Sequence, residues 1–107
     1  MSDPLEEKRR RVLVTEVAIF HAVAGKEDEL GRAIKQGQVI IRSHPDCLSA
    51  QVERCIEDPA QYICTYSWTS REAHTVSFRD GPLFQEWRRH IDGLFEGAPV
   101  VFHYQAF

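Results

Sequence analysis

The stretch WTSREAH, residues 68–74, places a tryptophan and a histidine on either side of a helix-start signal. A histidine exchanges its proton near neutral pH, and an indole ring packs well against other aromatic rings. Thr69 and Glu72 have the spacing of a capping box, with Thr69 as the cap. The stretch therefore predicts either the rim of a pocket that handles a proton or an ordinary strand-to-helix corner.

The motifs that are absent from the sequence exclude several classes of partner and cofactor. The 107 residues carry a net charge of −3 and contain neither a P-loop nor a GxGxxG motif, so neither nucleic acid nor nucleotide is expected as a partner. The three cysteines form no CxxC and no zinc-site spacing, so no metal is expected. Their odd number and the absence of an export signal predict reduced thiols in the cytoplasm. No stretch is long enough to span a membrane.

Hydrophobic periodicity predicts the order β-α-β-β-α-β in one domain, residues 12–107, after a flexible N-terminal tail, residues 1–11. The first strand is apolar on both of its alternating faces, which is typical of a central strand covered on both sides. The expected strands are 12–23, 47–57, 62–68 and 100–107, and the expected helices are 26–44, 69–79 and one that begins at Pro82.

This order favours an α+β, ferredoxin-like fold, with a four-stranded antiparallel sheet and its helices on one face. The other face of the sheet then needs a cover. The simplest cover is a second copy of the chain, sheet against sheet, with the last strand, residues 100–107, in contact with the other subunit.

The second and third strands are expected to form a hairpin centred on Pro59 and Ala60. This register would place Cys55 opposite Cys64, Glu53 opposite Tyr66, and Gln51 opposite Trp68, although a slip of one residue would change every pair. In this register Cys55 and Cys64 could form a redox pair. The alternative is that Cys64 is a small buried hydrophobic residue.

Residues 65–87, TYSWTSREAHTVSFRDGPLFQEW, resemble the antibiotic biosynthesis monooxygenase family of the dimeric α+β barrel group. A strand that ends in Trp-x-Ser, then Glu-Ala-His, and then a helix that opens with Pro-x-Phe-x-x-Trp follow in the family's order. AGKEDEL after the first strand and the closing VVFHY also fit, so the resemblance covers residues 12–107. It implies a homodimer with a small pocket between the sheet and the helices of each subunit.

The resemblance also implies an activity. Characterised members of the family are monooxygenases that oxidise phenols or quinols without metal, flavin or haem, so a small aromatic, polyketide-like substrate, dioxygen and no cofactor are expected. Such chemistry requires an apolar pocket, a group that favours the phenolate, and the exclusion of water.

The resemblance gives candidate roles to nine residues. It points to Trp68, His74 and Arg88 as catalytic, with His74 or His90 as the base and Arg88 stabilising the anion. The candidates for contact with the substrate are Cys64, Tyr66, Phe78, Phe84, Trp87 and His90.

The chain departs from related patterns because it contains no asparagine. A haem-degrading branch of the group uses an asparagine, a tryptophan and a histidine, and the matching positions here hold Ala18, Phe78 and Arg88. Some quinol-oxidising members use an asparagine on the third strand, where this chain has Cys64.

Other interpretations stay open. The protein could bind or sense a small molecule without catalysis, or it could be an isomerase or decarboxylase in which His74 or His90 moves a proton. Trp68 and Trp87 could be ordinary core residues, and His74 could be a partly exposed side chain bonded to the backbone.

Overall fold

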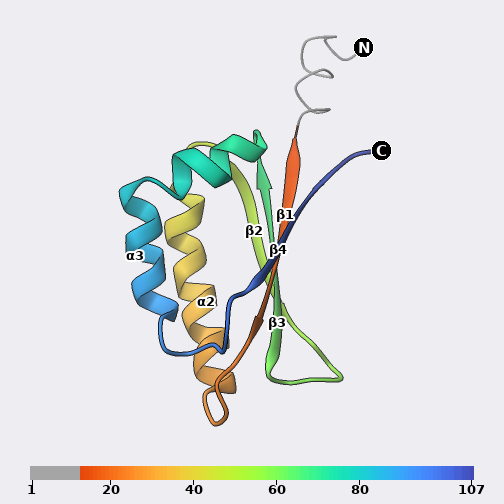
Figure 1. Ribbon diagram of the computed structural model, residues 1–107, viewed down its shortest axis with the longest axis vertical. Coiled ribbons are helices and arrows are strands. Elements are labelled where there is room, and N and C mark those ends of the chain that lie inside the picture. Colours follow the sequence, from red (N-terminus) through yellow and green to blue (C-terminus); the bar gives the residue numbers. More distant parts are fainter. Residues whose placement is uncertain (1–12) are drawn as a thin grey trace.

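The computed structural model describes residues 13–107 as one antiparallel sheet covered by helices on a single side (Figure 1). The strand order β2-β3-β1-β4 confirms the ferredoxin-like α+β class. The expected tail at residues 1–11 and the first residue of the first strand, Val12, lie outside this description. The elements are β1 (Val14–His21), α2 (Glu27–Arg42), β2 (Cys47–Arg54), β3 (Gln61–Trp68), η1 (Ala73–Phe78), α3 (Pro82–Ile91) and β4 (Val100–Gln105).

The central strand β1 alternates between a buried inner face and a partly exposed outer face. Val14, Glu16, Ala18 and Phe20 point toward the helices and are buried. Glu16 is paired with Tyr66 of β3 on one side and with His103 of β4 on the other. The register therefore brings these three polar side chains into one row beneath the helices.

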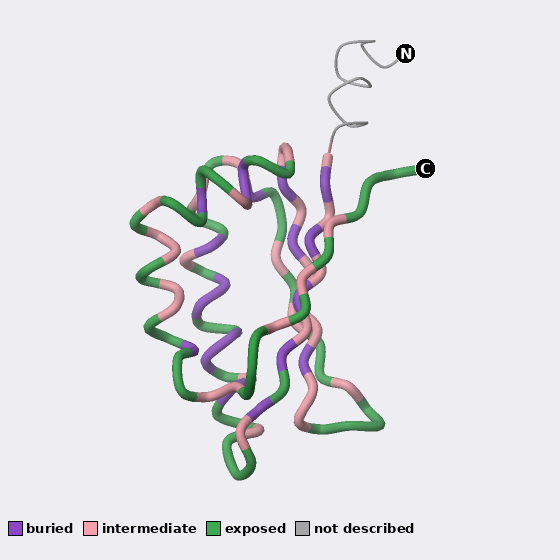
Figure 2. The backbone as a smooth tube through the Cα atoms, in the orientation of Figure 1, coloured by how far each residue is buried: buried purple, intermediate pink, exposed green. Residues whose placement is uncertain are grey.

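The two helices are buried to different extents. The face of α2 toward the sheet is lined by buried residues along its whole length, whereas α3 has one buried residue, Ile91 (Figure 2). Gly37 of α2 allows α3 to come close, because a Cβ at that position would lie 2.9 Å from Cδ1 of Trp87. Trp87 is thereby held against α2 while the rest of α3 stays half-exposed.

The expected β2–β3 register is wrong by three residues. Val52, not Cys55, is opposite Cys64, and Ala50 is opposite Tyr66. The reason is the connection, in which the Cys55 N–H donates to the carbonyl of Gln61, so that residues 55–60 form a loop outside the strands. The redox pair built on that register is therefore not supported, and all three cysteines are free.

The corner after β3 also differs from the expected capping box. Ser70, not Thr69, is the cap, since its hydroxyl oxygen accepts a hydrogen bond from the Ala73 N–H at 3.0 Å. The following segment, η1, is a π-helix, and the Arg79 N–H donates to the carbonyl of His74 at 3.2 Å. The wider turn places His74 and Phe78 on the same buried face, with ring centroids 6.3 Å apart.

Among the described residues, no helix is both long enough and apolar enough to cross a membrane. The cytoplasmic location expected from the cysteines stays a prediction.

Candidate active site

A cavity of about 80 Å³ lies between the inner face of the sheet and the η1 and α3 segments. Six of the nine candidate residues contribute to its wall, namely Tyr66, His74, Phe78, Phe84, Trp87 and Arg88. The wall is completed by Glu16, Ala18 and Phe20 of β1, Ile41 of α2, and Arg79, Ile91, Phe95, Pro99 and Val101. Aromatic rings form much of this surface, and Phe78 touches Phe84 and Trp87 edge-on.

Three of the candidates lie elsewhere. Trp68 and Cys64 are fully buried behind the cavity wall, and His90 is exposed on α3. Trp68 is nevertheless connected to the site, because its indole N–H donates to Glu16 Oε1 at 2.9 Å and its ring lies 5.3 Å from that of His74. Its place in the structure is that of a residue that positions Glu16 and His74.

Glu16 is the functional candidate that sequence reasoning missed. Its side chain is 5 % exposed and lines the cavity. A signal for it was present, since Glu16 follows the same alternation as Val14, Ala18 and Phe20 and therefore falls on the buried face of the strand. A buried carboxyl group is informative because it costs free energy unless it is paired or neutral.

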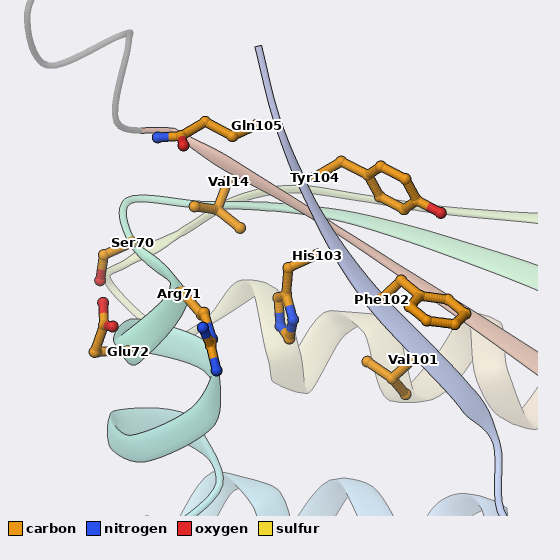
Figure 3. Close-up of a pocket in the computed structure, with 9 residues that line it drawn as sticks. All are labelled: Val14, Ser70, Arg71, Glu72, Val101, Phe102, His103, Tyr104 and Gln105. Carbon is orange, nitrogen blue, oxygen red and sulfur yellow. The ribbon is translucent and has the colours of Figure 1, made fainter. Parts of the chain in front are cut away.

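Glu16 belongs to a chain of close polar contacts. Its Oε1 lies 3.3 Å from His74 Nε2, and His74 Nδ1 lies 2.8 Å from His103 Nε2. His103 also lines a wide groove beside β4 (Figure 3). The contacts therefore run from the cavity to this groove.

Burial shifts the pKa values of these groups in opposite directions. It raises the pKa of Glu16 from 4.5 to about 7, although the Trp68 hydrogen bond and the charge of Arg79 oppose the increase. Burial, together with His103 and Arg79, lowers the pKa of His74 from 6.5 to about 4. At neutral pH His74 is therefore neutral, and Glu16 is close to the midpoint of its titration, where a base is most effective.

Two polar atoms in the cavity wall lack an internal partner. The Tyr66 hydroxyl and the Trp87 indole nitrogen are buried, and neither has a partner with good hydrogen-bond geometry within residues 13–107. The side chains of Cys64 and Gln38 nevertheless lie close enough to the Tyr66 hydroxyl to influence its pKa. Burial and the neighbouring Cys64 and Glu16 raise the pKa of Tyr66, so its hydroxyl keeps its proton. Both atoms can therefore donate to an oxygen atom of a bound molecule.

Arg88 lies at the edge of the cavity and is not free. Its Nε donates to Asp92 Oδ1 at 2.9 Å, and its guanidinium carbon lies 5.9 Å from the ring centres of both Phe84 and Phe95. It can attract an anion to this edge, although Asp92 shares its charge.

The described residues contain no group of three or more His, Cys, Asp or Glu side chains that could hold a metal ion. Glu16 and His103 contact opposite nitrogens of His74, so the three side chains do not converge on one point.

Comparisons with known proteins point to one family. The antibiotic biosynthesis monooxygenase family profile matches residues 13–90. The uncharacterised protein YczJ of Bacillus subtilis (strain 168) is 29% identical over 93 residues, which are 87% of this chain and 98% of YczJ.

Solved structures agree with this match. A Bordetella bronchiseptica protein, provisionally described as an antibiotic biosynthesis monooxygenase, superposes with a TM-score of 0.84 at 27% identity, over 89% of this chain and 97% of its own. A Chloroflexus aurantiacus protein with the same provisional description has a TM-score of 0.71 at 23% identity, over 89% and 93% of the two chains, and shows the likeness of fold alone.

Proposed function

We propose that the chain, which belongs to the antibiotic biosynthesis monooxygenase family, oxidises a small electron-rich phenol or quinol with dioxygen in the cavity described above. The observation that carries this proposal is the contact between Glu16 and His74 in the wall of a partly enclosed aromatic cavity. An acid–base pair in a water-poor site can remove the proton of a phenol and leave a phenolate surrounded by rings.

The phenolate then supplies the electrons, so no separate redox centre is needed. One atom of dioxygen forms a new C–O bond on the ring and the other leaves as water, while the ring ends as a quinone. Phenol and dioxygen give benzoquinone and water in this way, and all four electrons that dioxygen takes up come from the substrate. Arg88 and Arg79, at the wall, favour the negative charge that develops.

The size of the cavity restricts the substrate. Ligand sites usually measure about 300–1,000 Å³, and a dry cavity of about 150 Å³ can accept benzene. The cavity here, about 80 Å³, is smaller than either. A single ring therefore fits better than a fused, polyketide-like one, and it enters by displacing the half-buried Phe84 and Trp87 of α3.

The outer face of the sheet supports the expected homodimer. Val100, Phe102 and Tyr104 are 48 %, 57 % and 56 % exposed. The register places Val17 and Ile19 of β1 directly beside this row, so one apolar surface crosses two strands. We propose that a second copy of the chain covers this surface, because its helices occupy only the inner face (Figure 1).

A second function, proton transfer, is favoured by one specific observation. The Glu16–His74 pair can move a proton without dioxygen, as an isomerase or decarboxylase requires. Simple binding of a small molecule, in a sensor, would need the cavity but not this pair.

The test is dioxygen uptake by metal-stripped protein with hydroquinone, 1,4-dihydroxynaphthalene and a hydroxyanthracene. We expect saturable uptake, strongest with the single ring, and a loss of about 100-fold or more in kcat/KM for His74→Ala. Trp68→Phe, which loses the hydrogen bond to Glu16, should give a smaller loss. His90→Ala serves as the matched control, since His90 is exposed and does not line the cavity.

Saturable binding without uptake would reject the monooxygenase. Exchange of a substrate carbon-bound proton with deuterated solvent would then identify proton transfer, and its absence would leave a binding protein.

A further inference from the structure

We propose that Glu16, His74 and His103 form a relay that carries the substrate proton from the partly enclosed cavity to the open groove beside β4. The inference rests on the proposed function and assigns two residues, Glu16 and His103, that the family resemblance did not single out.

The relay connects a cavity and a groove, and none of its three residues lines both of them. Glu16 and His74 line the cavity of about 80 Å³, whereas His103 lines a groove of about 530 Å³. Ser70, Arg71 and Glu72 line this groove on one side of β4, and Phe102 and Tyr104 of the proposed dimer surface line it on the other (Figure 3). Figure 3 shows the His103 ring pointing from β4 toward the segment that carries Arg71. His74, 5 % exposed, lies between them and contacts a different neighbour through each ring nitrogen.

The fold creates this connection through the sheet register. Glu16 and His103 are direct partners on β1 and β4 and point to the same face. The π-helical turn of η1 then places the His74 ring above the pair, within 3.3 Å of one and 2.8 Å of the other. Trp68 holds the Glu16 carboxyl group in place from β3.

The relay gives buried Glu16 a route by which it can lose the proton it has accepted. Once Glu16 has accepted the phenolic proton it is neutral and can act again only after losing that proton. The carboxyl group is 5 % exposed, so direct release to water is hindered. Transfer of the proton through the imidazole rings of His74 and His103 avoids the need for direct release to water.

Each step moves one proton and breaks one bond to hydrogen for each that it forms. The phenol O–H breaks as the Glu16 O–H forms. Glu16 then protonates His74 Nε2, His74 gives up the proton on Nδ1 to His103 Nε2, and His103 releases the proton on Nδ1 to water in the groove. Glu16 is thereby returned to the carboxylate, and both rings have changed from the Nδ1–H to the Nε2–H tautomer. Both rings must return to the Nδ1–H tautomer, by rotation of the ring or by proton exchange, before the next turnover.

The charged groups around the relay suit this role. The charge of Arg79 acts on Glu16, His74 and His103, and the charge of Arg71 acts on His103. Burial first, and then these two arginines, lower the pKa of His103, so the ring is neutral at neutral pH and can accept a proton at one nitrogen. The remaining neighbours of Glu16, namely Cys47, Cys64 and Tyr66, have pKa values raised by burial and stay uncharged.

The experiment removes the outer end of the relay and replaces it with a free base. With hydroquinone as substrate, we expect His103→Ala to lower kcat by about 10-fold or more with little change in KM. Added imidazole should restore its kcat in a saturable manner but leave His74→Ala and the unchanged protein unaffected. Glu72→Ala, in the same groove but without contact to His74, should keep its kcat.

A second variant keeps the test valid if His103→Ala fails to fold. His103→Gln preserves the size and polarity of the side chain but cannot pass a proton between two nitrogens, so it should lose kcat equally. An unchanged kcat in either variant, or a loss in folded His103→Ala that imidazole does not restore, would overturn the relay while the oxidation itself stands.

A measurement without substrate separates the two proposals. If the unchanged protein consumes no dioxygen, the proposed function fails, and the nitrogen resonances of ¹⁵N-labelled histidines then decide the relay. We expect the nitrogen chemical shifts of His74 and His103 to change together over the pH range in which Glu16 titrates. In Glu16→Gln this change should be absent from both. A His103 titration that is identical in the two proteins would refute the connection.

Discussion

The two faces of the sheet depart from the usual distribution of side chains in opposite ways. On the inner face Glu16 and His74 are ionisable and yet about 5 % exposed. On the outer face Phe102 and Tyr104 are large and apolar and yet more than half exposed. A buried polar group and an exposed apolar patch are the two observations that single out functional surface in a soluble domain.

The difference shows how one strand can serve two partners. His103 of β4 points inward, and its neighbours Phe102 and Tyr104 point outward. Proton chemistry needs the inner side, where burial shifts pKa values, whereas association needs apolar area that water would otherwise cover. Because successive side chains of a strand point to opposite faces, neighbouring residues of β4 can meet these two requirements separately.

The largest expected effect concerns the inner face and the pH dependence of stability. The pKa of Glu16 is raised from 4.5 to about 7, so its stabilisation is complete below pH 4.5 and is lost as the pH rises through 7. The pKa of His74 is lowered from 6.5 to about 4, so its stabilisation is complete above pH 6.5 and is lost as the pH falls through 4. The two trends nearly cancel while both groups are present.

Single substitutions should therefore reveal opposite slopes. In Glu16→Gln the free energy of unfolding should rise by about 3 kcal/mol from pH 4 to 6.5, and in His74→Gln it should fall by about 3 kcal/mol from pH 4.5 to 7. Urea unfolding at several pH values measures both. The double variant is the control and should lack both of these changes, leaving only the smaller pH dependence of groups such as His103 and Glu27. Slopes of the same sign in the two single variants would contradict this account.

A smaller effect is expected on the outer face. Phe102→Asp places a charge in the middle of the proposed dimer surface and should weaken self-association by about 30-fold, the equivalent of about 2 kcal/mol. Sedimentation equilibrium measures the change. Ile56→Asp is the matched control, because Ile56 is 92 % exposed in the β2–β3 loop, away from this surface. A monomeric unchanged protein would disprove the surface assignment.

The smallest effect distinguishes two tyrosines on the inner face of β3. The Tyr62 hydroxyl donates to the carbonyl of Glu27 at 2.9 Å, whereas the Tyr66 hydroxyl has no partner with good hydrogen-bond geometry within the described residues and only approaches the side chains of Cys64 and Gln38. Tyr62→Phe should lower the free energy of unfolding by about 1 kcal/mol, and Tyr66→Phe should leave it unchanged or raise it slightly. Thermal unfolding of the two variants compares them directly, and an equal loss in both would mean that Tyr66 is satisfied in solution.

The sequence by itself determined the element order, the fold class and the neighbourhood of the site. Alternation and helical periodicity are local properties, so strands and helices could be located to within a few residues, as for α2 at Glu27–Arg42 against the expected 26–44. The spacing from Trp68 to Trp87 indicated the family, and six of its candidate residues line one cavity. The apolar outer face of β1 indicated a missing cover.

Only the tertiary structure decided which groups meet. The β2–β3 register depended on where a six-residue loop closes, and composition does not specify that closure. Glu16 and His103 are far apart in the chain and become partners through strand pairing, while a π-helical turn brings His74 between them. Their shifted pKa values follow from that shared burial, which is a property of the assembled core and not of any one segment.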